Sequence, residues 1–110
     1  MTKSDADILG QLQAWYFDRC DGEWEHLHVI SIGTIDNPGW KIYIDFADTY
    51  LAGRIFEDVQ VKGSETGSWY DCKIRGCVFE AFCDPNGLST VLSIFLQWAM
   101  QPTSEKSGSE

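Results

Sequence analysis

Basic side chains are scarce in this sequence of 110 residues. Lysine and arginine together number 8 against 17 aspartates and glutamates, which leaves a formal net charge of −9. Proteins that bind nucleic acid through its phosphates need clustered lysine and arginine, so the composition argues against that class. A membrane-spanning helix needs roughly 20 apolar residues in a row, and the longest apolar run here is far shorter. The short signatures of common hydrolase, nucleotide-binding and metalloprotease sites are also absent from the sequence.

Apolar residues make up 44% of the chain and aromatic residues 14%. Intrinsic disorder requires fewer large apolar residues, and a chain of this length fits one domain. We therefore predict a single domain over residues 1–101, followed by a disordered polar tail over residues 102–110. The N-terminus has one lysine followed by acids, in place of the basic stretch and apolar run of a secretory signal. We expect a cytoplasmic protein on that ground.

The four cysteines of the chain could form disulfides or bind a metal. They are Cys20, Cys72, Cys77 and Cys83. The reducing cytoplasm argues against disulfides, and the spacing does not repeat the paired pattern of structural zinc sites. We predict buried free thiols that pack as small hydrophobic side chains. A metal site and a disulfide stay as alternatives.

Apolar residues recur at helical spacing near both ends of the chain and alternate with polar residues between them. Ser4 and Asp7 resemble a capping box, which predicts a helix over residues 5–20. Asp84 as N-cap and Pro85 at the first helical position predict a second helix that ends near residue 100. Strands are predicted at residues 25–35, 40–46, 55–61, 70–75 and 77–83. The predicted fold class is α+β: an antiparallel sheet of about five strands in a meander, with the N-terminal and C-terminal helices packed on one face.

Two histidines and three nearby acids are the first candidates for chemistry. His26 and His28 would lie on the same face of the predicted strand, where they could bind a metal with Glu23 or Glu25 as a third ligand. Histidines hydrogen-bonded along a sheet face are the alternative. Because two ligands without a third make a weak site, we predict no metal and no cofactor. Asp21, Glu23 and Glu25 could serve acid–base catalysis or form a solvated surface.

The tryptophans could stack on a ligand or fill the core. Trp15 and Trp98 fall on the apolar stripes of the predicted helices, and Trp40 opens a strand on its buried side. These three are predicted to be core residues. The pattern does not decide between core and partner contact for Trp24 and Trp69.

Five short runs form a specific pattern along the chain. They are residues 12–16 (LQAWY), 20–26 (CDGEWEH) and 34–40 (TIDNPGW), the pair Trp69 and Cys72, and residues 94–98 (IFLQW). In this order and spacing they resemble the immunity protein 53 family of bacterial polymorphic-toxin systems. The resemblance covers residues 9–98, and the second and third runs are its specific portions. Leu27 and His28 depart from the family pattern, which has an aromatic residue and a glycine there.

The resemblance implies a non-enzymatic inhibitor that binds the C-terminal domain of a cognate toxin and contacts neither nucleic acid nor membrane. Many such toxin domains are basic nucleases, and an acidic protein can cover a phosphate-binding surface. A stable complex buries about 1,200–2,000 Å² in total. Two other function classes stay open: a small metal-dependent or hydrolytic enzyme that uses His26, His28 and nearby acids, and a carbohydrate- or peptide-binding module based on exposed tryptophans.

Carboxylates and aromatic side chains near the shared motifs are the expected contacts with a toxin. The predicted partner-binding residues are Asp21, Glu23, Trp24, Glu25, Asp36, Tyr43, Asp45 and Asp48. Turn formation and packing are an alternative role for the motif residues among them. The sheet face opposite the helices is the alternative interface, and it would carry Lys41, Tyr43, Asp45, Asp71, Lys73 and Glu80.

Overall fold

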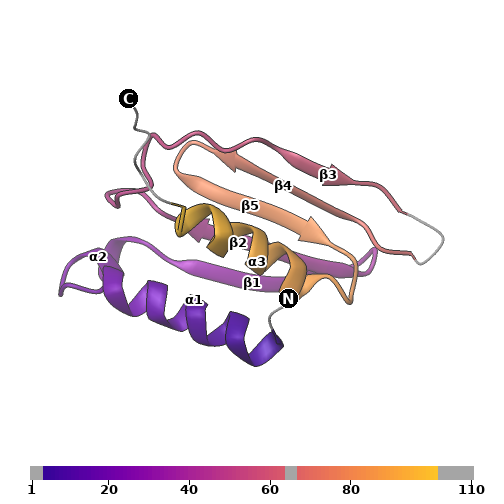
Figure 1. Ribbon diagram of the computed structural model, residues 1–110, viewed down its shortest axis with the longest axis horizontal. Helices are drawn as coiled ribbons and strands as arrows, with labels where there is room; N and C mark the ends of the chain where they lie inside the picture. The colour runs from indigo at the N-terminus through magenta and orange to yellow at the C-terminus, as the bar shows by residue number, and fades with distance from the viewer. Residues whose placement is uncertain (1–3, 64–66, 102–110) are drawn as a thin grey trace.

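A computed structural model describes residues 4–63 and 67–101. In chain order its elements are α1 (Asp5–Arg19), α2 (Trp24–Leu27), β1 (Ile30–Ile35), β2 (Gly39–Asp45), β3 (Val59–Val61), β4 (Tyr70–Arg75), β5 (Val78–Cys83) and α3 (Leu88–Ala99). The strands form one antiparallel sheet, and α1 and α3 pack on one of its faces (Figure 1). The α+β class and the antiparallel sheet flanked by terminal helices are confirmed. The predicted tail, residues 102–110, lies outside the described residues.

The strand order differs from that of a simple meander. Neighbouring strands in the sheet follow the order β1-β2-β5-β4-β3, so β2 pairs with β5. After β2 the chain passes to the far edge through residues 46–58 and returns toward the centre along β3, β4 and β5 (Figure 1). This order places β5 at the centre with β2 beside it. Their inward side chains Ile42, Ile44, Phe79 and Ala81 are all 0% exposed, so the order buries the apolar faces of both strands.

Both terminal helices bury an apolar stripe. Ser4 caps α1 as predicted, since its side chain accepts a hydrogen bond from the N–H of Asp7 at 3.1 Å. The helix buries Ile8, Leu12 and Trp15, and Trp15 meets Phe95 of α3 edge to face, with ring centroids 5.1 Å apart. Of the described helices, none is long and apolar enough to cross a membrane.

The predicted start of the second helix was too early. Asp84 accepts hydrogen bonds from the N–H groups of Asn86 and Trp69, and its own C=O accepts from the N–H of Gly87. Asp84 therefore closes a turn after β5 and links it to Trp69, the residue before β4. Helix α3 begins at Leu88, with Gly87 at its N-cap.

Two predicted strands are shorter in the structure. Residues 25–29 do not extend β1, because they form the one-turn helix α2 and its exit. The third strand, predicted over residues 55–61, is confined to Val59–Val61, and Ile55 lies outside it and is 85% exposed. The segment before β3 is tied to α3 instead: the Trp98 indole N–H donates to the C=O of Ile55 at 2.9 Å, and Arg54 donates to the C=O of Trp98 at 2.9 Å.

The turn at residues 36–39 has a packing role. A side chain at Gly39 would collide with the carbonyl oxygen of Cys83, so only glycine allows β2 to approach β5 this closely. Trp40 follows it and donates its indole N–H to the C=O of Pro85 at 2.9 Å. This stretch of the shared pattern therefore fixes the hairpin against the β5–α3 connection.

Candidate functional site

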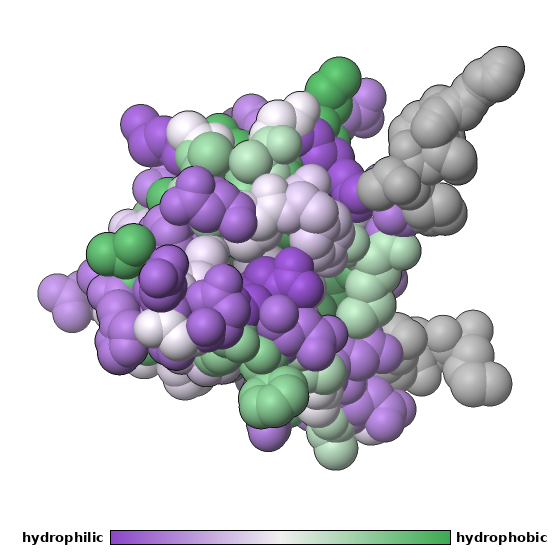
Figure 2. Space-filling model, turned by 90° about the vertical axis from the view of Figure 1, so that its left-hand side faces the viewer, coloured by the Kyte–Doolittle hydropathy of each residue, from purple (hydrophilic) through white to green (hydrophobic). Residues whose placement is uncertain are grey.

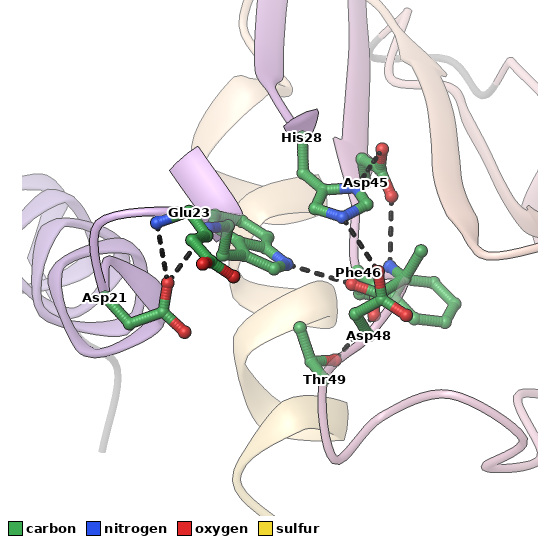
Figure 3. A network of polar contacts seen from close by, with 9 residues as sticks. Asp21, Glu23, His28, Asp45, Phe46, Asp48 and Thr49 are labelled. Atoms are coloured by element: carbon green, nitrogen blue, oxygen red, sulfur yellow. Dashed lines mark hydrogen bonds and ion pairs between the residues drawn. The ribbon is translucent and has the colours of Figure 1, made fainter. Parts of the chain in front are cut away.

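Several of the predicted partner-binding residues come together at one end of the molecule. We call this set the acidic end: the carboxylates of Asp21, Glu23, Glu25, Asp45 and Asp48. Figure 3 shows four of them, Asp21, Glu23, Asp45 and Asp48. The α1–α2 loop supplies Asp21 and Glu23, and α2 supplies Glu25. The end of β2 and the following loop supply Asp45 and Asp48. In Figure 1 this end lies on the left, beside α2, and Figure 2 shows it covered mostly by hydrophilic side chains.

The α1–α2 loop is held by its own carboxylates. One oxygen of Asp21 accepts from the N–H groups of Glu23 and Trp24, each at 2.9 Å. Glu25 reaches back and accepts from the N–H of Asp21 at 3.0 Å and from that of Gly22. These hydrogen bonds fix the turn that leads into α2, whose N-cap residue is Glu23. The hydrogen bonds from Trp24 and then Glu23 hold the pKa of Asp21 below its ordinary value.

Trp24, one of the predicted partner-binding residues, is buried in the core. Its side chain is 6% exposed, and its indole N–H donates to the C=O of Ala47 at 2.9 Å. The ring meets Trp15 edge to face at 6.1 Å and lies 5.1 Å from the ring of His28. Trp24 therefore joins the start of α2 to the loop after β2.

His28 bridges two acids of the acidic end (Figure 3). Its Nδ1 lies 2.8 Å from Asp45 Oδ2 and its Nε2 lies 3.2 Å from Asp48 Oδ2. Asp45 also accepts from the N–H of Ala47 at 3.0 Å. The hydrogen bond to Asp45 is the largest cause that raises the pKa of His28 above its ordinary value; burial opposes it, and Asp48 adds a smaller effect. An imidazolium can donate to both carboxylates at once.

The raised pKa of His28 predicts a pH dependence of stability. Because the pKa of His28 is higher in the folded than in the unfolded chain, the protonated ring stabilises the fold. This stabilisation is fully present below the pKa of the unfolded chain, about 6.5, and is lost as the pH rises through the pKa of the folded chain. The loss in melting temperature caused by His28→Gln should therefore be larger at about pH 6 than at about pH 9.

An NMR titration of the histidine ring protons measures the same effect directly. Asp45→Asn should lower the His28 pKa, whereas Asp36→Asn, which removes a carboxylate at the other end of the hairpin, should leave it unchanged. An assigned His28 pKa at or below about 6.5 in the wild type contradicts the bridging geometry.

The remaining predicted residues lie away from the acidic end. Asp36 is in the β1–β2 turn, at the opposite end of β2 from Asp45 (Figure 1). Tyr43 lies mid-strand on the sheet face opposite the helices, and its ring meets Phe82 edge to face at 6.3 Å. The structure thus brings six of the eight residues into one region and leaves two outside it.

The alternative interface, on the open sheet face, carries side chains of both charges, and Glu80 there is paired with two basic residues. Glu80 lies 3.3 Å from Arg75 and 3.9 Å from Lys73. Basic and acidic side chains alternate there, so this face has a weaker net field than the acidic end.

Metal binding has little support within the described residues. No group of three or more histidine, cysteine, aspartate or glutamate side chains with the arrangement of a metal site is found there. The predicted same-face pair of histidines was wrong, because His26 belongs to α2 and His28 follows it. All four cysteines are free thiols, but of the four predicted to be buried only Cys72 and Cys83 are, whereas Cys20 and Cys77 are partly exposed. Burial raises the pKa of Cys72 to about 12 and that of Cys83 to about 11.

Sequence reasoning missed the bridge from His28 to Asp45 and Asp48. The signal that could have found it is the hairpin register. The turn pairs Ile35 with Gly39, and continuing that register outward brings residue 28 level with residue 46, next to Asp45.

A comparison with known protein families finds a match. The model of a family described as immunity protein 53 matches residues 9–100 of the chain. The match covers α1 from Leu9 onward, the whole acidic end and α3. No curated protein and no solved structure matches.

Proposed function

This chain belongs to the immunity protein 53 family, and from that membership we propose that it neutralises a cognate bacterial toxin domain by forming a direct stoichiometric complex through its acidic end. Membership in the family supports an immunity function and implies a toxin protein as the partner. The binding surface, the one-to-one complex and action in the cytoplasm of the producing cell are parts of the proposal.

The observation that carries the proposal is the fixed arrangement of carboxylates at the acidic end. Asp21 and Glu25 are held by backbone N–H groups, and Asp45 and Asp48 by His28. No lysine or arginine of the described chain lies within 4.0 Å of these carboxylates. Because these carboxylate side chains are already ordered, they would lose little conformational entropy when a basic partner binds.

The net charge of −9 supports the same proposal. An acidic field accelerates encounter with a basic protein and suppresses binding to acidic ones. We propose a toxin domain with a basic active surface, of which a nuclease is one chemical class. The inhibitor would then occupy the surface that otherwise holds phosphates, a binding role that needs no catalytic group.

A titration tests direct binding. The toxin domain encoded beside this chain, purified in an inactive form, should bind in a one-to-one ratio when titrated into the chain by calorimetry. Because the proposed contacts are between charges, the affinity should fall by about 10–100-fold between 0.05 M and 0.5 M salt. Absence of any binding, with both proteins folded, contradicts the proposal; tight binding without salt dependence contradicts the role of the acidic end.

A further inference from the structure

Strand β1 has a free edge. It is the terminal strand of the sheet in the part of the chain that the structure describes. The N–H of Asp45 donates to the C=O of Val29 at 3.1 Å, so odd-numbered residues of this strand direct their backbone groups toward β2. Hydrogen-bonding direction alternates along an antiparallel strand. Ile30, Ile32 and Thr34 therefore direct their N–H and C=O groups away from the sheet.

This edge lacks the usual protection against strand pairing. β1 has the sequence ISIGTI, with no charged residue and no proline. Free edges are normally blunted by charges, by proline or by shortness. The opposite edge has that protection, since β3 is three residues long and is flanked by Asp58 and Lys62.

An apolar groove runs between this edge and α1. It has a volume of about 400 Å³, and Leu12, Tyr16, Val29 and Ile30 are among the residues that line it. Leu9 lies on the same stripe of α1 as Tyr16 and is 49% exposed. On the core-facing side of β1, Ile32 is 41% exposed. Helix α1 thus extends its apolar surface past the last strand of the sheet.

We propose that an extended segment of the toxin adds to the free edge of β1 as a further strand, with apolar side chains in the groove and a lysine or arginine beside Glu25 and Asp48. This inference rests on the proposed function. The unpaired backbone groups select an extended chain, since each of them needs a hydrogen-bonding partner when covered.

Charge complementarity selects a basic partner. Glu25 and His28 line the groove at the end near α2, and His28 contacts Asp45 and Asp48, so the groove is continuous with the acidic end. A second copy of the chain would bring another net charge of −9 to the same place.

Hydrogen–deuterium exchange on the chain with and without the toxin domain encoded beside it tests the strand addition. In the complex, peptides that cover residues 29–35 should exchange at least about tenfold more slowly than in the free chain, because the outward N–H groups gain partners. Ile32→Lys should weaken binding at least about 30-fold, because a charge replaces an apolar contact. Ile32→Pro removes the outward N–H group of residue 32 without adding a charge, and it should also weaken binding.

Ile55→Lys is the matched control, since Ile55 is 85% exposed and lies in the segment before β3, at the other edge of the sheet. It should change the affinity by less than about twofold. A complex without protection of residues 29–35, and with normal binding of folded Ile32 variants, overturns the strand addition and leaves the proposed function standing. No complex at all overturns both. If residues 29–35 of the free chain exchange more slowly as its concentration rises, a second copy of the chain pairs with this edge, and the inference is also overturned.

Discussion

Replacing Trp24 with alanine should lower the free energy of unfolding by about 3–5 kcal/mol, the range for truncating a buried aromatic side chain. The substitution removes the ring that contacts Trp15 and His28, and it leaves the C=O of Ala47 without its donor. Urea unfolding measured by circular dichroism gives the loss. Trp24→Phe keeps most of the packing and loses only the N–H donor, so it should cost about 1–2 kcal/mol.

The same variants separate a structural role from a contact role for Trp24. If Trp24→Ala has the stability of the wild type but fails to bind the toxin domain, the ring is an interface anchor, as the sequence first suggested, and its buried position is contradicted. The structure predicts instead that Trp24→Ala lowers stability, and that any loss of toxin binding is a consequence of that lower stability.

Changing the charge of the acidic end should weaken toxin binding by at least about 30-fold, or about 2 kcal/mol. The variant is Glu23→Lys with Asp48→Asn. Glu23 and Asp48 are exposed. Asparagine suits the backbone of Asp48, whose φ is 62°. Surface plasmon resonance at low and moderate salt measures the change.

Glu57→Lys with Asp58→Asn is the matched control. It makes the same change in net charge at two exposed acids that precede β3, near the opposite edge of the sheet. If both double variants weaken binding equally, only the overall charge matters and the acidic end is not the interface. If the first alone weakens binding while its melting temperature stays close to that of the wild type, the contact is local.

Local sequence signals were sufficient for much of the fold. The alternation from Trp40 to Phe46 predicted β2 correctly, with Ile42 and Ile44 inward, and the Ser4 cap placed the start of α1. These elements are determined by side chains within a few residues of each other, which is the range over which periodicity and capping act.

The strand order could not be read from the same signals. Whether β2 pairs with β3 or with β5 depends on which strands best fill the centre under α3, a competition between distant parts of the chain. The one-turn helix α2 was missed for a local reason. Asp21 and Glu25 hydrogen-bond to nearby N–H groups and so override the strand preference of the residues that follow.

The candidate site was predicted in part. The acids before β1 were identified as a cluster from their closeness in sequence, but their union with Asp45 and Asp48 depends on the hairpin register and on the fold around His28. The sequence did not decide whether Trp24 lies in the core or at the surface, because its burial depends on packing against Trp15, a contact between two elements.

A protection assay tests the central claim most directly. The toxin domain encoded beside this chain is expressed in a sensitive bacterial host, with and without the chain, and the two proteins are then co-purified. We predict restored growth and a stable one-to-one complex with the wild-type chain, and impaired growth with the Glu23→Lys, Asp48→Asn variant. If growth is not restored and no complex forms, although both proteins are soluble and folded, direct neutralisation of that toxin is contradicted.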